Sequence, residues 1–235
     1  MQTKTDFPGE DKLKNLIQTR RNFVTGAISA ALAACFATGV IAAPAPPVTV
    51  EKSKPVVSSK ETATLAAGCF WSMEAIFKLL KGVEKVEPGY AGGKVDSPSY
   101  EQVETGTTGH AEALKITFDP KTISFKDLLE VMLTMRDPTS VNRQGNDEGP
   151  QYRSIIFFHN DDQKKSATEM IDKFNKSHVW PNPIVTKVEP LQKFYRAEDY
   201  HFDYYRLHPT QGYCRVVIAP EIADFKKRFK AKLKK

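Results

Sequence analysis

Cysteine is scarce in this chain, whose 235 residues include only Cys35, Cys69 and Cys214. Three cysteines are too few for a disulfide-based scaffold. They also lack the closely spaced Cys and His pairs of a structural zinc site. These cysteines are therefore left with packing or thiol chemistry as their roles.

A general distribution of positive charge is also missing. The formal net charge is +6, but the last ten residues hold seven Lys or Arg and no acid, so the rest of the chain is close to neutral. A nucleic-acid-binding protein would usually spread its basic residues over a binding face. We therefore expect no nucleic-acid function, and we interpret the basic end as the solvated face of a final helix.

The first 43 residues have the pattern of an export signal. Arg20-Arg21 precedes an uncharged Ala- and Gly-rich run over residues 24–43, which resembles a twin-arginine signal with cleavage after Ala42. Two alternatives stay open: lipidation of Cys35, or retention of the run as a membrane tether, since about 20 apolar residues can span a bilayer. All three routes put the globular part in the periplasm, or on the membrane facing it.

The remaining residues divide into a linker at 44–60, rich in Pro, Val, Ser and Lys, and one domain at 61–235. The predicted elements of the domain begin in the order β-α-β-β-α-β, the split βαβ or ferredoxin-like pattern of an α+β fold. Such a fold has a mainly antiparallel sheet with helices on one face. The predicted strands cover residues 62–67, 83–90, 113–119, 154–159 and 184–190, and the predicted helices cover 70–81, 124–135, 161–177, 197–207 and 220–233.

The motif Gly68-Cys69-Phe70-Trp71 lies where the first predicted strand gives way to the first helix. A helix N-terminus favours a thiolate over a thiol, because its N–H groups and dipole stabilise negative charge. The two aromatic residues that follow suit an apolar, uncharged substrate. A buried structural cysteine is the ordinary alternative for a lone Cys.

Three polar clusters lie near other strand ends: Tyr100, then His110-Ala111-Glu112 just before a strand, and then residues 143–153, which include Tyr152. Two of these clusters belong to the long loops 92–110 and 137–152, and long loops on a compact scaffold are often functional. A thiol, a carboxylic acid and phenols can therefore meet at one sheet edge. Taken singly, Tyr100 and Tyr152 are more often packing residues.

Cys214 follows a turn-rich segment near the C-terminus. From the sequence alone, it can either resolve an oxidised Cys69 or form a permanent disulfide with it, which export would permit.

In combination, these residues resemble the A-type peptide methionine sulfoxide reductases, which act on the S-epimer of the sulfoxide. The similarity runs from about residue 63 to residue 214 and includes many motifs in order. They are Gly68-Cys69-Phe70-Trp71, Gly89-Tyr90-Ala91-Gly92-Gly93, Pro98-Ser99-Tyr100, Thr108-Gly109-His110-Ala111-Glu112, Arg143-Gln144-Gly145-Asn146-Asp147, Gln151-Tyr152-Arg153-Ser154 and Gly212-Tyr213-Cys214.

The resemblance implies a reaction mechanism. Cys69 would attack the sulfoxide sulfur, and Glu112 would donate a proton to the sulfoxide oxygen. Tyr100 and Tyr152 would donate hydrogen bonds to that oxygen as charge develops on it. To act as an acid Glu112 needs a raised pKa, which an apolar pocket would give it by desolvation.

The resemblance also assigns the surrounding roles. Phe70 and Trp71 would hold the substrate methyl group, and Asp147 would help to orient the site. A sulfenic acid on Cys69 would then form a disulfide with Cys214, which a thioredoxin-like protein or a dithiol would reduce. The implied substrates are oxidised proteins, peptides or free methionine sulfoxide; no metal or bound cofactor is needed, and we expect a monomer.

Two other functions remain alternatives at this stage. A thiol peroxidase or redox sensor would also use Cys69 and Cys214, but it needs neither an aromatic methyl pocket nor an acid such as Glu112. A non-enzymatic module that binds methionine-rich proteins would hold the two cysteines as a structural bridge. Many family members carry a further C-terminal cysteine, which residues 215–220 lack, so we expect a single resolving thiol.

Overall fold

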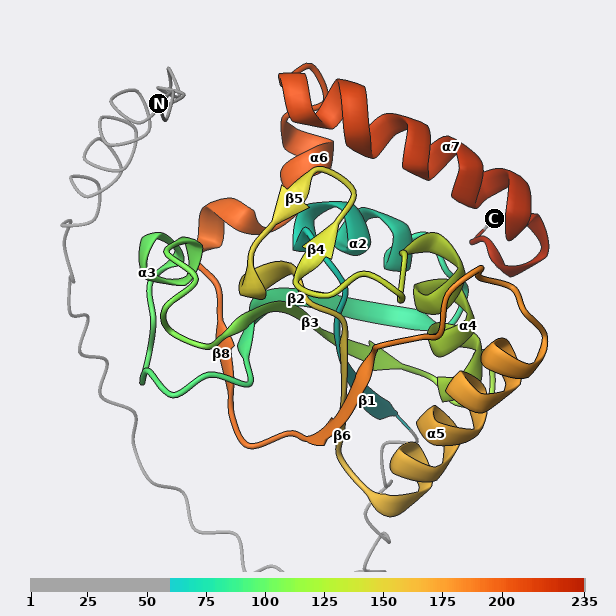
Figure 1. Ribbon diagram of the computed structural model, residues 1–235. Coiled ribbons are helices and arrows are strands. Elements are labelled where there is room, and N and C mark those ends of the chain that lie inside the picture. Colours follow the sequence, from blue (N-terminus) through green and yellow to red (C-terminus); the bar gives the residue numbers. More distant parts are fainter. Residues whose placement is uncertain (1–59, 235) are drawn as a thin grey trace, which may run out of the picture. The chain divides into compact units, whose positions relative to one another are not determined.

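A six-stranded sheet lies at the centre of residues 60–234, the part of the chain that the computed structural model describes (Figure 1). The strand order is β7-β6-β1-β3-β2-β8, and all neighbours are antiparallel except the parallel pair β6–β7. The strands are β1 (Glu61–Ala66), β2 (Val83–Ala91), β3 (Ala111–Phe118), β6 (Ile155–Phe158), β7 (Lys187–Pro190) and β8 (Phe194–Arg196). A separate hairpin pairs β4 (Arg143–Gln144) with β5 (Asp147–Glu148).

Helices pack beside this sheet and confirm the α+β class. They are α2 (Phe70–Phe77), α3 (Tyr100–Glu104), α4 (Phe125–Met135), α5 (Asp161–Lys176), α6 (Tyr204–Leu207) and α7 (Ala219–Arg228). Short 3-10 turns occur at η2 (Pro150–Tyr152), η3 (Asp199–His201) and η5 (Lys230–Lys232), and a π-helical turn, η4 (Cys214–Ile218), leads into α7. The predicted export signal at 1–43 and all but the last residue of the predicted linker at 44–60 lie outside the described residues.

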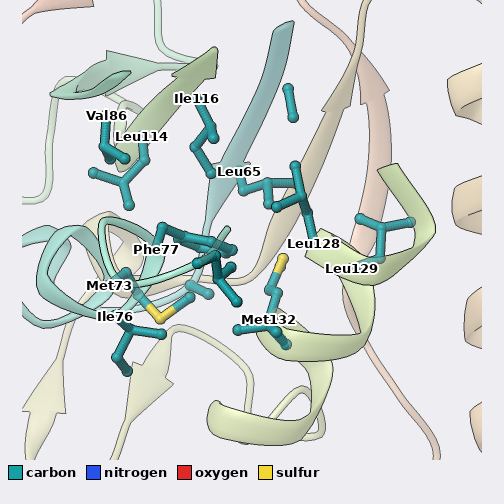
Figure 2. Packing of buried hydrophobic residues seen from close by; sticks show 14 of the residues in the cluster. Leu65, Met73, Ile76, Phe77, Val86, Leu114, Ile116, Leu128, Leu129 and Met132 are labelled. Atoms are coloured by element: carbon teal, nitrogen blue, oxygen red, sulfur yellow. The ribbon is translucent and has the colours of Figure 1, made fainter. Parts of the chain in front are cut away.

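The two faces of the sheet are buried by different means. Alternate residues of β3, among them Leu114 and Ile116, point into the large core that α2 and α4 cover, as expected from the two-residue period of a strand. Ala111 and Ala113 point to the opposite face, into a smaller cluster with Phe157. Figure 2 shows the large core, where side chains from the sheet meet those of α2 and α4: Leu65, Met73, Ile76, Phe77, Val86, Leu114, Ile116, Leu128, Leu129 and Met132.

Several predicted boundaries change in the structure. Helix α2 ends at Phe77, four residues before the predicted end at residue 81, because the chain then tightens into a turn with hydrogen bonds to the residue three positions earlier and pairs with the C-terminal tail. The N–H of Lys81 donates to the Lys232 carbonyl at 2.9 Å, and the N–H of Lys234 donates to the Leu79 carbonyl at 2.8 Å. The segment 197–207, predicted as one helix, contains η3 and α6, and strand β8 just before it was missed.

The two long loops contain ordered elements that the sequence analysis overlooked. Loop 92–110 includes α3, whose N-terminus has a capping box between Ser99 and Gln102, a Ser-x-x-Gln signal that the sequence does carry. Loop 137–152 includes the β4–β5 hairpin and η2. These elements hold Tyr100, Asp147 and Tyr152 on defined backbone.

Within residues 60–234, no helix combines the length and apolar character needed to span a bilayer. The same residues contain no group of three or more His, Cys, Asp or Glu side chains arranged to hold a metal ion.

Candidate active site

Glu112 lies beneath the N-terminus of α2, next to Cys69. It is the second residue of β3 rather than part of a preceding loop, which corrects the sequence prediction. Strand alternation puts its side chain on the same face as Leu114, and it is only 2% exposed. Its Oε2 accepts a hydrogen bond of 2.8 Å from the main-chain N–H of Phe70, the residue after Cys69. The carboxyl group is therefore fixed against the segment that carries the thiol.

Burial governs the charge of this carboxyl group. It raises the pKa of Glu112 well above the usual range; the Phe70 N–H opposes that shift, and the nearby acids Glu104 and Asp147 add to it. Glu112 is therefore held in its protonated form over a wider pH range than an exposed Glu. Because Oε2 accepts from Phe70, we expect the acidic proton on Oε1.

The Cys69 thiol also favours its neutral form, so the expected preference for a thiolate is wrong. Cys69 is the N-cap of α2, and the Ser72 and Trp71 amides do lower its pKa as the helix end predicts. Desolvation by burial is the larger effect, and Glu112 adds to it, so the pKa of Cys69 lies well above its usual value.

The two predicted phenols, Tyr100 on α3 and Tyr152 on η2, lie near Glu112. The Tyr100 ring stacks on Phe70 with centroids 6.4 Å apart, and its main-chain N–H donates to Glu198 at 2.9 Å. The Tyr152 carbonyl accepts from the Gly68 N–H at 3.2 Å, directly before Cys69. Burial raises the pKa of both phenols far above the usual range, with Glu112 adding to the shift. Both therefore remain O–H donors at neutral pH.

Asp147 reaches the site from the β4–β5 hairpin through Tyr213, which the sequence analysis gave no role. The Tyr213 hydroxyl donates to Asp147 Oδ2 at 2.6 Å. Burial raises the pKa of Tyr213, and Cys69 is the next contributor, so this phenol also lies near the thiol. Burial likewise raises the pKa of Asp147, and the Tyr213 hydrogen bond opposes that shift.

The aromatic wall contains more residues than the predicted Phe70 and Trp71. The Trp71 indole stacks on Tyr204 at 3.8 Å with an interplanar angle of 7°, and its Nε1–H donates to His201 Nδ1 at 2.9 Å. Burial lowers the pKa of His201 to about 4, so this imidazole is neutral at physiological pH. The aromatic composition of segment 197–207 was visible in the sequence, but nothing in it indicated contact with Trp71.

Cys214 lies in a helical turn rather than in the loop that its turn-rich neighbours indicate. It is the first residue of η4 and is fully buried in the large core. The side chain of Gln211 accepts from its N–H at 3.0 Å. Cys69 and Cys214 are both free thiols. Burial is the largest cause of the raised pKa of Tyr204, and both thiols add to it, so this phenol lies near both sulfurs.

Comparisons with known sequences agree on one family. A family model described as peptide methionine sulfoxide reductase matches residues 61–233. A protein of Polynucleobacter asymbioticus named peptide methionine sulfoxide reductase MsrA is 50% identical over 171 residues, which cover 73% of this chain and 90% of that protein. Its namesake in Sulfolobus acidocaldarius is 52% identical over 169 residues, covering 72% of this chain and 95% of that protein.

Solved structures give the same result. The reduced form of Mxr1 from Saccharomyces cerevisiae is 37% identical with a TM-score of 0.62, covering 66% of this chain and 89% of its own. Methionine sulfoxide reductase A of Corynebacterium diphtheriae is 32% identical with a TM-score of 0.63, covering 66% of this chain and 77% of its own.

Proposed function

This chain belongs to the A-type peptide methionine sulfoxide reductases, which reduce the S-epimer of methionine sulfoxide, and on that premise we propose that Cys69 is the nucleophile and Glu112 the proton donor. The observation that carries this assignment is the 2.8 Å hydrogen bond from the Phe70 N–H to Glu112 Oε2. It joins the buried acid to the residue next to the thiol.

The first step transfers one oxygen atom. The Cys69 sulfur attacks the sulfoxide sulfur while the Glu112 proton moves to the sulfoxide oxygen, which turns a poor leaving group into a good one. The carboxylate formed at Glu112 takes up the thiol proton of Cys69. The methionine S–O bond then breaks as the protonated oxygen transfers to the Cys69 sulfur, and the S–S bond formed by the attack breaks with its electron pair returning to the methionine sulfur, giving methionine and a sulfenic acid. Because Cys69 and Glu112 both favour their neutral forms, the resting site holds both protons that this step moves.

The remaining groups bind and orient the substrate. Tyr100 and Tyr152 donate to the sulfoxide oxygen, where negative charge develops in the transition state. Phe70 and Trp71 pack around the substrate methyl group, and the stacking of Trp71 on Tyr204 supports this role because it fixes the indole ring. Asp147 orients the site through its bond with Tyr213.

The second step regenerates the enzyme through Cys214. Its thiol attacks the Cys69 sulfenic acid, forming a disulfide and releasing water, and a thioredoxin-like protein or a dithiol then reduces the disulfide by exchange. The free thiols of Cys69 and Cys214 are consistent with the reduced resting state. This cycle uses no metal or bound organic cofactor.

We describe the centre of the fold as ferredoxin-like. The antiparallel order β6-β1-β3-β2 supports this description, together with the chain order β1-α2-β2-β3-α4-β6 of the main elements. In this arrangement Cys69 follows β1 and Glu112 is the second residue of β3, and these two strands are neighbours.

We further propose that the enzyme acts as a monomer outside the cytoplasm on oxidised proteins. Arg20-Arg21 and the apolar run 24–43 support export. The intact mass of the mature protein from a membrane and periplasm preparation tests this. Cleavage after Ala42, lipidation at Cys35 and retention of the run each give a different mass, and an uncleaved chain in the cytosol would refute export.

One assay separates this function from its two alternatives. The protein is incubated with dithiothreitol and each epimer of a methionine sulfoxide peptide, and methionine is quantified. We expect turnover of the S-epimer only. Reduction of peroxide without methionine formation would favour the thiol peroxidase, and the absence of any turnover would favour a binding module.

A further inference from the structure

Glu104, the last residue of α3, is an acid that the proposed mechanism does not use. Its Oε2 accepts a hydrogen bond of 3.0 Å from the Tyr152 hydroxyl, which belongs to η2, nearly fifty residues later in the chain. Its Oε1 is inaccessible to solvent and has no hydrogen-bond partner among the described residues. A buried carboxyl oxygen without a partner is most costly when the group is ionised, and protonation of the carboxyl group, with the hydrogen on Oε2 facing Tyr152, would remove the charge and lower that cost.

The surroundings of Glu104 favour such a proton. Burial raises its pKa as the largest effect and Asp147 on β5 adds to that shift, whereas the Tyr152 hydroxyl and the Gln151 side chain oppose it. Glu104 in turn raises the pKa of Glu112 on β3, of Tyr100 on its own helix and of Tyr152 on η2. The titratable groups that face Glu104 are thus two carboxyl groups and two phenols, and ionisation of Glu104 would add negative charge to an already acidic group of side chains.

We propose that Glu104 is a positioning residue that decides where the Tyr152 hydroxyl donates its hydrogen. Ionised Glu104 accepts that hydrogen and withdraws it from the substrate. Protonated Glu104 donates to the Tyr152 oxygen instead, and the Tyr152 hydrogen is then released toward the sulfoxide oxygen. This inference rests on the proposed role of Tyr152 as a donor to the substrate.

The protonation state of Glu104 matters because a phenol has a single donor hydrogen, although its oxygen can also accept a hydrogen bond. With ionised Glu104, a carboxylate and the sulfoxide oxygen compete for that hydrogen, and the charged acceptor wins. With protonated Glu104, the three groups form one chain of hydrogen bonds in which each donor polarises the next. Tyr152 therefore assists the reaction in only one of the two states.

The pH dependence of the Tyr152→Phe effect tests this proposal. Methionine formed in a single turnover of pre-reduced enzyme is measured from about pH 5 to about pH 9, so that the reductant does not contribute. With Glu104 present, we expect Tyr152→Phe to slow the reaction about threefold to tenfold at low pH and to have little effect at high pH, as expected for the loss of one hydrogen bond. In the Glu104→Gln background, whose amide does not ionise, the cost of the same substitution should not change with pH.

Two further variants act as controls. Glu101→Gln changes an exposed acid on the same helix and should leave the pH dependence of the Tyr152→Phe effect intact. Glu104→Met can neither accept nor donate and should remove that pH dependence, which provides a second route if Glu104→Gln folds poorly.

A purely structural role for Glu104 would give a Tyr152→Phe effect that does not change with pH in any background, and that result would overturn the proposal. Wild-type enzyme that forms no methionine at any pH would instead refute the reductase function, and the role of Glu104 with it. The two failures are therefore distinguishable.

Discussion

The main-chain N–H of Phe70 donates to Glu112 Oε2 at a distance of 2.8 Å. The donor is the first residue of α2 and the acceptor lies on β3, so the start of the helix holds the carboxyl group of the neighbouring strand. Any movement of this helix end shifts Cys69 and Glu112 together. The contact depends on an unpaired N–H of the first helical turn, which every helix offers at its N-terminus.

The raised pKa of Glu112 should make stability depend on pH. The unfolded chain has the usual Glu pKa of about 4.3, whereas burial raises the pKa in the folded state. The folded protein therefore binds this proton more tightly, and the associated stability is fully present below about pH 4.3 and lost as pH rises through the folded pKa. Urea unfolding at a series of pH values should show Glu112→Gln gaining stability relative to wild type with increasing pH, by about 1.4 kcal/mol per unit of pKa shift within that window. A difference between the two proteins that stays constant with pH would contradict this.

Cys214→Ser should uncouple the first reaction step from recycling. Without the resolving thiol, the sulfenic acid on Cys69 has no partner in the described part of the chain, since Cys69 and Cys214 are its only cysteines. We expect one methionine per enzyme with thioredoxin as the reductant, followed by a stall, whereas wild type continues. Quantification of methionine against enzyme concentration gives the stoichiometry. Sustained turnover of the variant would show that another thiol resolves the intermediate.

An ion pair with a buried arginine should anchor the helix that follows Cys214. Arg136, at the C-terminus of α4, donates to both oxygens of Glu221 on α7, at 2.6 and 3.0 Å, and also contacts Ser72 on α2. Its side chain is 5% exposed. Arg136→Met leaves Glu221, which is 25% exposed, with only its hydrogen bond from Ser72, so we expect a loss of about 1–3 kcal/mol in the free energy of unfolding.

Urea unfolding of a matched variant provides the comparison for Arg136→Met. Arg228 pairs with Asp224 on the same helix, but both side chains are about half exposed, so Arg228→Met should change the unfolding free energy by less than about 1 kcal/mol. Equal effects of the two substitutions would mean that the Arg136 pair contributes no more than an ordinary surface contact.

The sequence predicted the main elements well where local patterns decide them. The strand predicted at 113–119 from its alternating pattern corresponds to β3, and the helix predicted at 124–135 corresponds to α4, whose N-cap is Ser124. The strand was started too late because Glu112 interrupts the apolar alternation, although it lies on the buried face. Likewise, the helix-end rule gave the right sign for the amides acting on Cys69, but burial, which depends on the whole fold, outweighs them.

The contacts of the site were less accessible to sequence reasoning. Tyr213 bonds to Asp147 across 66 positions, and Trp71 bonds to His201 across 130. No local spacing rule connects residues so far apart. The Ser-x-x-Gln capping box at Ser99, by contrast, is readable in the sequence and marks the start of α3 beside Tyr100.

The most direct measurement is single-turnover methionine formation by Glu112→Gln, with pre-reduced enzyme and an S-epimer sulfoxide peptide. Glu84→Gln, which changes an exposed acid on β2, is the matched control, and circular dichroism checks the fold of both variants. Because the amide can accept the Phe70 hydrogen bond but has no acidic proton, we predict a folded enzyme that is slower by about 10²- to 10⁴-fold, with the control at the wild-type rate. A folded Glu112→Gln variant that forms methionine at the wild-type rate would contradict the assignment of Glu112 as the proton donor.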